Sequence, residues 1–221
     1  MSKKSSEEIS ERDRVPVLND DLNLEVLREL GSIGAGNAAT ALSEILQQPV
    51  TIEVPKVYTL PPHLIQKYYG YHDRTVTAIY SQLSGDMDCD ILLLFDPDEE
   101  KKIVTLMTSV SSAEEIDPEM AKSAIEELGN ILIGSFLSAI ANFTGIKLLP
   151  TYPQRAMDSF DAIIDNFLIK QAIFSNISLV FETRFIGNQG TGNCLLIIFL
   201  SRELYQLLVL KATEWLNRDQ T

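Results

Sequence analysis

Apolar side chains recur every three or four residues along two long stretches of the chain, and this spacing predicts two amphipathic helices. The first is expected at Leu24–Gln47 and the second at Pro118–Thr144. Each should bury one face against a sheet and display the other. The apolar residues of the first helix include Leu30, Ile33, Leu42, Ile45 and Leu46. Those of the second form a broad stripe of Ile125, Leu128, Ile131, Leu132, Phe136, Ala139, Ile140 and Phe143.

Runs that are typical of strands follow each long helix and are bounded by turn residues. An extended segment through a proline comes first, at Pro55 in one half and at Pro153 in the other. Two hairpins are then expected, Thr75–Leu83 with Cys89–Phe95 and Ile177–Ile186 with Cys194–Leu200. A short helix should close each half, because Asp96-Pro97-Asp98 and Ser201 supply side chains that favour a helix start.

The two halves are copies of one pattern. A shift of 98 residues superimposes Glu29-Leu30-Gly31-Ser32-Ile33 on Glu127-Leu128-Gly129-Asn130-Ile131, and Pro55 on Pro153. Neither copy could cover a long helix and three strands alone, so we expect the two to join. The predicted fold is α+β, two-layer and internally duplicated with pseudo-two-fold symmetry. Its mostly antiparallel six-stranded sheet should carry the two long helices.

The predicted organisation is one domain at residues 22–221 that follows a flexible N-terminal arm at residues 1–21. The domain is expected to consist of two repeats, at about 22–110 and 117–217, with a connector at 109–117.

The displayed face of each predicted helix carries a stripe of polar and small residues. A glycine inside a helix costs about 1 kcal/mol relative to alanine, so Gly36 and Gly134 suggest that a partner surface comes close. The spacing places Ser123, Glu127, Asn130, Gly134 and Ser138 on one face of the second helix. The first helix repeats the stripe with Glu25, Glu29, Ser32, Gly36 and Thr40.

Polar residues on an exposed helix usually do no more than face solvent, and on one helix that interpretation would be preferred. The stripe occurs twice, however, and a proline follows 23 residues after both Ser32 and Asn130. This repetition favours a functional surface.

The charge balance excludes some partners. Acidic residues outnumber basic ones by 31 to 18, so a net charge of −13 repels nucleic acid and anionic membrane surfaces. The apolar run Cys194–Leu200 is far shorter than the ~20 residues of a membrane span. Residues 1–21 lack the apolar core of a signal peptide, so a cytoplasmic protein is expected. The two cysteines, Cys89 and Cys194, are expected to be buried thiols, and no metal site is predicted.

The second stripe resembles the motif of the CheC, CheX and FliY family of response-regulator phosphatases. That motif is Asp or Ser, three residues, Glu, two residues, Asn, 22 residues and Pro, and the chain matches it at Ser123, Glu127, Asn130 and Pro153. The phrase Glu-Leu-Gly-x-Ile-Gly-Ala-Gly-Asn in the first copy is similar to the CheC branch.

The first copy departs from this motif. It retains Glu29 and Pro55, but Glu25 stands in the Asp or Ser position and Ser32 replaces the asparagine. Serine is too short to place a carboxamide over a phosphoryl group, so the first site is interpreted as degenerate.

The resemblance implies a CheC-like fold and a substrate, the aspartyl phosphate of a CheY-type regulator. It further implies that Asn130 orients the attacking water and that Glu127 docks the regulator by pairing with its active-site lysine. The surrounding surface would help to bind the regulator through Ser123, Gly134, Ser138 and Pro153, and in the first copy through Glu25, Gly36 and Pro55. No cofactor of its own is implied, because the phosphorylated partner supplies Mg²⁺.

The CheC branch also implies a second partner, the receptor-modifying deamidase CheD. Two alternatives to catalysis therefore stay open: a binding module like the middle domain of the switch protein FliM, and a regulator that acts by binding CheD. The intact pair Glu127 and Asn130 favours the phosphatase, because a pure adaptor has no need of both.

Overall fold

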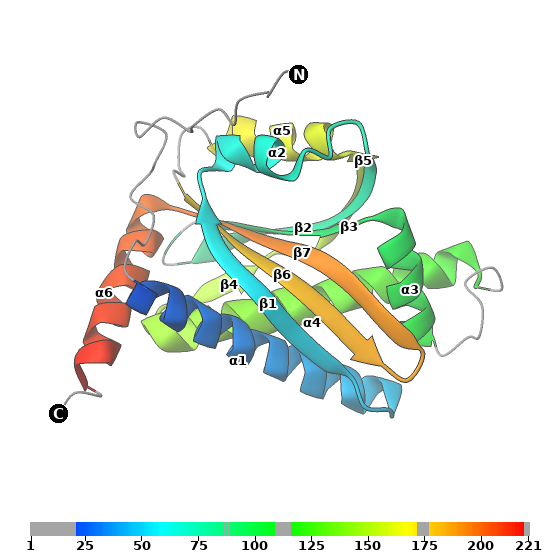
Figure 1. Ribbon diagram of the computed structural model, residues 1–221, viewed down its shortest axis with the longest axis horizontal. Helices are drawn as coiled ribbons and strands as arrows, with labels where there is room; N and C mark the ends of the chain where they lie inside the picture. The colour runs from blue at the N-terminus through cyan, green and yellow to red at the C-terminus, as the bar shows by residue number, and fades with distance from the viewer. Residues whose placement is uncertain (1–20, 86, 88, 109–115, 172–176, 219–221) are drawn as a thin grey trace, which may run out of the picture.

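A computed structural model describes residues 21–85, 87, 89–108, 116–171 and 177–218, and Figure 1 shows how they are arranged. The strands are β1 (Thr51–Leu60), β2 (Thr75–Gly85), β3 (Cys89–Phe95), β4 (Leu148–Pro150), β5 (Gln154–Ser159), β6 (Ile177–Gly187) and β7 (Gly190–Leu200). The helices are α1 (Asp21–Leu46), α2 (Ile65–Tyr69), α3 (Pro97–Thr108), α4 (Pro118–Thr144), α5 (Phe160–Gln171) and α6 (Arg202–Arg218), with a 3₁₀ turn at Pro62–Leu64.

Local capping chemistry defines the helix ends and confirms the predicted starts of α3, α4 and α6, whereas α1 begins at Asp21 instead of the predicted Leu24. At α4, Oδ2 of Asp117 accepts hydrogen bonds from the backbone N–H groups of Glu119 and Met120 at 3.1 and 3.2 Å. At the other end Gly145 adopts a left-handed conformation with φ of 77°. The closing helices begin at the predicted caps, Asp96 for α3 and Ser201 for α6.

The two repeats exchange strands within one antiparallel sheet. Its order is β1-β6-β7-β3-β2, with both β4 and β5 beside β2. Strand β1 of the first repeat pairs with β6 of the second, whereas β5 of the second pairs with β2 of the first. The hairpins β2–β3 and β6–β7 meet where β3 pairs with β7. From one edge inward the strands are β1, β6 and β7, and from the other edge they are the equivalent β5, β2 and β3. The predicted duplication requires this symmetry.

The α+β fold class is confirmed, but the sheet has seven strands instead of the six that were predicted. The difference arises at the two prolines, which cannot donate a ladder hydrogen bond. Strand β1 runs through Pro55 by shifting its register between Glu53 and Lys56. The equivalent segment around Pro153 breaks instead, which divides it into β4 and β5.

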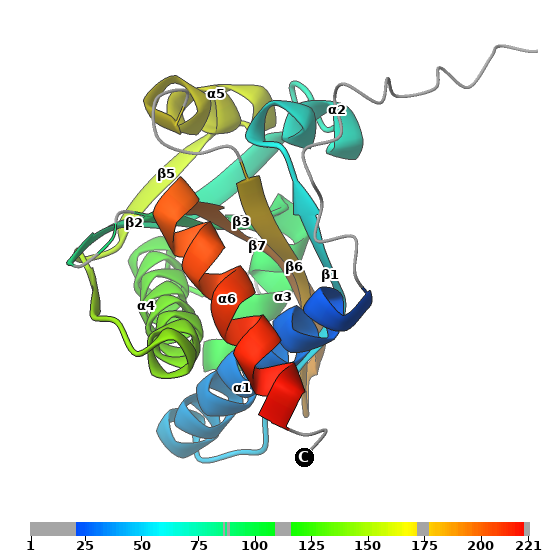
Figure 2. The ribbon, with the colours of Figure 1, turned by 90° about the vertical axis from the view of Figure 1, so that its left-hand side faces the viewer.

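A third, smaller layer of helices was not predicted. On one face of the sheet α1, α3, α4 and α6 bury a large core, as Figure 2 shows. On the other face lie α2 and α5. There a second core gathers Ile65, Phe160, Ile163, Ile164 and Phe167 from the helices against Val76, Ala78, Leu92, Leu94, Val180, Leu195, Ile197 and Phe199 of the strands. The sheet is therefore covered on both faces, and the two-layer prediction is incomplete.

Glycines let the long helices approach the core closely. A Cβ built at Gly129 of α4 would stand 2.4 Å from Cγ2 of Ile79 in β2. At the equivalent Gly31 of α1 it would stand 3.0 Å from Cδ1 of Phe181 in β6. Each long helix therefore rests on a hairpin of the other repeat, and this contact fixes which face it displays.

Helix α4 is long and apolar enough to cross a membrane when judged by length and composition alone. Half of its most apolar stretch is buried inside the protein, as in the core helix of a folded domain. Most of the predicted arm at 1–21 and of the connector at 109–117 lies outside the described residues. The predicted domain bounds therefore stay a prediction.

Candidate functional site

The polar stripe of α4 faces solvent. Ser123, Glu127, Asn130 and Ser138 are exposed and Gly134 is half-buried. The opposite side is packed into the core, where Ile125, Leu128 and Leu132 are fully buried. The helix thus presents Glu127 and Asn130 outward, one turn apart, with a rigid packed face behind them.

Neither of these two side chains is engaged inside the protein. Within the described part of the chain, Glu127 and Asn130 have no hydrogen-bond or ion-pair partner. A carboxylate can accept hydrogen bonds from a cation, and a carboxamide can both donate and accept. The surface is therefore free to engage a molecule from outside.

The corresponding face of α1 is displayed in the same way. Glu25, Glu29, Ser32 and Gly36 are exposed, and Thr40 donates a hydrogen bond through Oγ1 to the carbonyl of Gly36 at 2.9 Å. Two apolar residues assigned to this helix also face solvent, since Ile33 and Ile45 are 43% and 55% exposed. The core side is supplied instead by Val26, Leu27, Leu30, Ala35, Ala38 and Leu42.

Open space surrounds the two glycines of the stripes. A Cβ at Gly36 or at Gly134 would have no neighbouring atom within 4 Å. The expected close approach is therefore not made by any described part of this chain, so a partner surface stays a prediction. Sequence reasoning missed the glycines that do pack, Gly31, Gly34 and Gly129. Gly31 and Gly129 superimpose in the duplication, and that signal could have identified them.

The motif prolines differ between the repeats. Pro153 is buried between β4 and β5, whereas Pro55 is exposed within β1. Ordered backbone surrounds Pro153, because Thr151 donates its N–H to the carbonyl of Gln82 at 2.8 Å and accepts the Gln82 N–H through Oγ1 at 3.2 Å. The segment that carries the second proline is thus fixed to β2.

A hollow of about 390 Å³ lies on the other face of the sheet, next to α2 and α5. Aromatic and aliphatic side chains line it, including Tyr69, Tyr71 and Phe160. The charges on its rim are paired within the chain, with Nζ of Lys56 3.1 Å from Oε2 of Glu182. Of the motif residues only Pro55 of the first copy lines it, and nothing about the hollow identifies a ligand.

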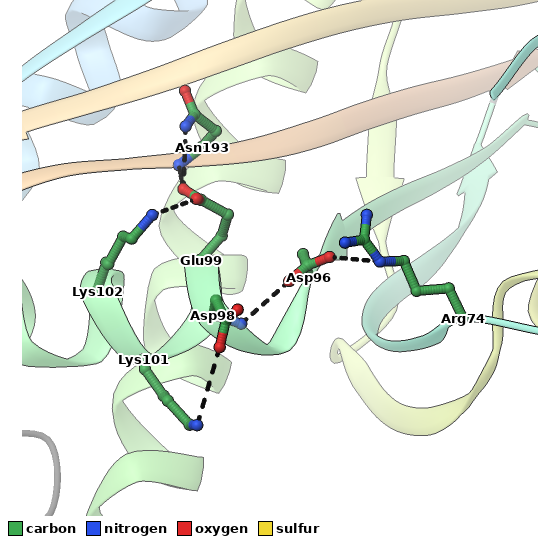
Figure 3. A network of polar contacts seen from close by, with 7 residues as sticks. All are labelled: Arg74, Asp96, Asp98, Glu99, Lys101, Lys102 and Asn193. Carbon is green, nitrogen blue, oxygen red and sulfur yellow. Dashed lines mark hydrogen bonds and ion pairs between the residues drawn. The ribbon is translucent and has the colours of Figure 1, made fainter. Parts of the chain in front are cut away.

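The polar network beside this hollow fastens α3 to the sheet (Figure 3). Oε2 of Glu99 accepts hydrogen bonds from the backbone and side-chain nitrogens of Asn193 at 2.7 and 2.9 Å, and Oε1 accepts one from Lys102 at 2.6 Å. Nearby, Nε of Arg74 lies 3.0 Å from Oδ2 of Asp96. Burial opposes ionisation of Glu99, but the hydrogen bonds from Lys102 and Asn193 outweigh it, so the pKa of this carboxyl lies below its usual value.

These contacts show that the network holds α3 on the sheet. In the portion of the chain that the structure describes, no group of three or more His, Cys, Asp or Glu side chains is placed to hold a metal ion. Cys89 and Cys194 are buried free thiols, as predicted. The exposed faces of α4 and α1 remain the candidate functional surfaces.

Comparison with known proteins supports the resemblance inferred from the motif. The CheC-like family model matches residues 22–59 and 120–155, which contain both stripes and both prolines. The CheY-P phosphatase CheC of Bacillus subtilis is 29% identical over 72% of this chain and 78% of its own length. The flagellar motor switch phosphatase FliY of the same organism is 26% identical over 61% of this chain and 36% of its own length.

Two solved structures share the fold. The crystal structure of Thermotoga maritima FliY superimposes with a TM-score of 0.66 at 20% identity, covering 88% of this chain and 97% of that one. The FliM middle domain from H. pylori gives a TM-score of 0.60 at 12% identity, covering 86% and 98%. At these identities the likeness shows a common fold alone.

Proposed function

We propose that this chain, whose two stripes and two prolines match the CheC-like family model, accelerates hydrolysis of the aspartyl phosphate on a CheY-type chemotaxis regulator. One observation carries this proposal. Glu127 and Asn130 stand one turn apart on an exposed helical face, and neither is paired with any described residue of the chain. A surface that is open and unpaired can enter the active site of another protein.

Asn130 would act on the attacking water. Phosphoryl transfer is catalysed mainly by positioning and by electrostatic stabilisation, so a group that fixes a water in line with phosphorus is sufficient to accelerate it. The carboxamide of Asn130 can accept a hydrogen bond from that water and donate another to a phosphoryl oxygen. Its backbone is held by the adjacent Gly129, which rests on Ile79. The packing behind the helix thus limits how far the amide can move.

Glu127 would dock the regulator. An ionised carboxylate forms a charge-assisted hydrogen bond with a lysine ammonium, such as the one expected in the regulator's active site. Its place one turn before Asn130 would align the amide with the phosphoryl group. The Mg²⁺ that this chemistry uses would arrive with the regulator, so this chain would supply positioning and no metal ligand.

The α1 face would be inactive or weakly active. It offers Glu29 for docking but only the short hydroxyl of Ser32 where α4 has a carboxamide. A partner such as the deamidase CheD could use other surfaces of the protein, and we retain it as a second partner in the cytoplasm.

The decay of a phosphorylated CheY-type regulator tests the proposal. The wild-type protein should shorten the lifetime of the aspartyl phosphate at substoichiometric concentration, whereas Asn130→Ala should lose at least about 100-fold in rate, as when an oriented hydrogen-bonding group is removed elsewhere. Asn142→Ala, which removes an exposed asparagine of the same helix outside the stripe, is the matched control. If the wild-type protein bound the regulator without changing its decay, a FliM-like adaptor would be the correct interpretation.

A further inference from the structure

Tyr152 is the most exposed large hydrophobic residue in the described part of the chain. It lies between β4 and β5, immediately before the buried motif proline Pro153, and is 80% exposed. An apolar ring in solvent loses the free energy of burial, so an ordinary loop tyrosine folds back onto the surface where it can. The local backbone explains why this one does not.

The residues on either side of Tyr152 are fixed. Before it, Thr151 donates its N–H to the Gln82 carbonyl at 2.8 Å, and its own carbonyl accepts a hydrogen bond from Oγ of Ser81 at 2.8 Å. After it, Pro153 is buried and its ring restricts the backbone. Tyr152 is therefore held outward by a backbone that is already ordered, so little conformational entropy would be lost on binding.

The first repeat has no such residue. Val54 occupies the equivalent position, 98 residues earlier, and it is partly buried against the core. Its Cγ1 would lie 3.5 Å from a Cβ at Gly31, so the side chain turns toward α1. At this position an outward aromatic thus occurs only in the repeat that carries the complete motif with Asn130.

The segment of Tyr152 lies beside α4, the helix that carries Asn130, because α4 packs on both β4 and β2. Gly129, the neighbour of Asn130, rests on Ile79 of β2. Gln82, whose carbonyl accepts a hydrogen bond from Thr151, is three residues farther along the same strand, about 10 Å from Ile79. A typical interface covers about 800 Å² on each partner, a patch roughly 16 Å in radius. Figure 2 shows α4 and β5 on the same side of the molecule.

The neighbouring edge of the sheet is open and apolar as well. Among the described strands β4 and β5 pair only with β2, which leaves their outer edge without a strand partner. Leu149 and Met157 on this edge are 59% and 56% exposed. Leu149 stands opposite Ser84 of β2 and Met157 opposite Thr77, so these two residues lie toward opposite ends of the edge.

We propose that Tyr152 is the aromatic anchor by which the aspartyl-phosphorylated regulator docks beside Asn130. This inference rests on the proposed phosphatase function and names a docking residue for it. The regulator is the proposed occupant of this edge because the edge adjoins the face of Glu127 and Asn130. A partner seated over Asn130 would also cover it.

Steady-state kinetics with the phosphorylated regulator test the docking role. Tyr152→Ala should raise KM about 10-fold or more while kcat stays within about 2-fold, as expected when a hot-spot aromatic is removed from an interface. Tyr152→Phe should restore most of the affinity, because it keeps the ring. Ile169→Ala, 76% exposed on α5 and remote from the motif, is the matched control and should leave KM unchanged.

Sedimentation of the same variants tests whether a second copy of the chain binds this edge instead of the regulator. If Tyr152→Ala abolished self-association and left KM unchanged, the edge would bind a second copy of the chain and the docking role would be wrong. An unchanged KM with no change in association would also reject it. If the wild-type protein failed to accelerate decay of the aspartyl phosphate, the proposed phosphatase function itself would be rejected. That outcome is distinct from an unchanged KM in Tyr152→Ala.

Discussion

The displayed faces of α1 and α4 have the same architecture but different chemistry. Both stripes are exposed, and both helices are held by a glycine that packs on the other repeat's hairpin. Only α4 carries a carboxamide, Asn130, where α1 has Ser32. The packing that the two helices share is required by the fold, because each repeat completes the other's sheet. The side chains on the open faces are under no such constraint and can differ.

Removing the charge of one glutamate on each face should reveal the largest difference in activity between the α4 and α1 surfaces. Glu127→Gln is expected to lower kcat/KM for the phosphorylated regulator by about 10-fold or more, because a hydrogen bond to a charged group contributes about 1.5–3 kcal/mol. Glu29→Gln should leave it nearly unchanged. Equal losses in the two variants would show that both faces dock the regulator in the same way.

Adding a methyl group to α4 should have opposite effects at its packed and open glycines. Gly129→Ala forces a Cβ to within 2.4 Å of Ile79 and should lower the free energy of unfolding by about 1–3 kcal/mol in a urea titration. Gly134→Ala meets no neighbour and should raise it by up to about 1 kcal/mol. A stability loss at Gly134 would mean that its surroundings are not open.

The closing helices offer a pH-dependent comparison. The pKa of Glu99 in α3 is lowered by its bonds to Lys102 and Asn193, so its contribution to stability is present above the unfolded value of about 4.5 and is lost as pH falls through the lower folded value. Glu99→Gln should therefore destabilise the protein by about 1 kcal/mol at pH 7, and by progressively less below pH 4.5. Glu203→Gln, at an exposed position in the first turn of α6, is the control and should show no such trend.

Restoring the missing amide on α1 should give the smallest effect. Ser32→Asn supplies the carboxamide next to the retained Glu29, so the rate per molecule should rise by at most about 2-fold if a second site becomes active. The measurement is the initial rate of phosphate release relative to the wild-type protein, repeated in the Asn130→Ala background, where any accelerated release must come from the new site. Absence of a gain would show that the α1 face lacks more than one residue.

The sequence predicted those features that depend on local chemistry. The Asp117-Pro118 start and the Gly145 end define α4 at its predicted bounds, and the duplicated stripe indicated which face would be open. Helix α5 was missed although Phe160, Ile163, Ile164 and Phe167 have helical spacing, and no element was predicted between Pro153 and the second hairpin. It covers the face of the sheet that the two-layer prediction left open.

Features that depend on distant contacts were not accessible from the sequence. The pairing of β1 with β6 joins residues more than 100 positions apart, and no local pattern specifies it. The same holds for Pro55 and Pro153, which look equivalent in the repeat but lie in a continuous strand and in a broken one. Tyr152 gave no signal, because its outward position depends on hydrogen bonds between Thr151 and β2.

The most direct test exchanges one side chain between the two faces. Asn130→Ser gives α4 the residue found at the same place on α1, and the decay of the phosphorylated regulator is followed in a single turnover with enzyme in excess. If the amide orients the attacking water, decay should return to the spontaneous rate although the regulator still binds. Decay as fast as with the wild-type protein would contradict the assignment of the chemistry to Asn130.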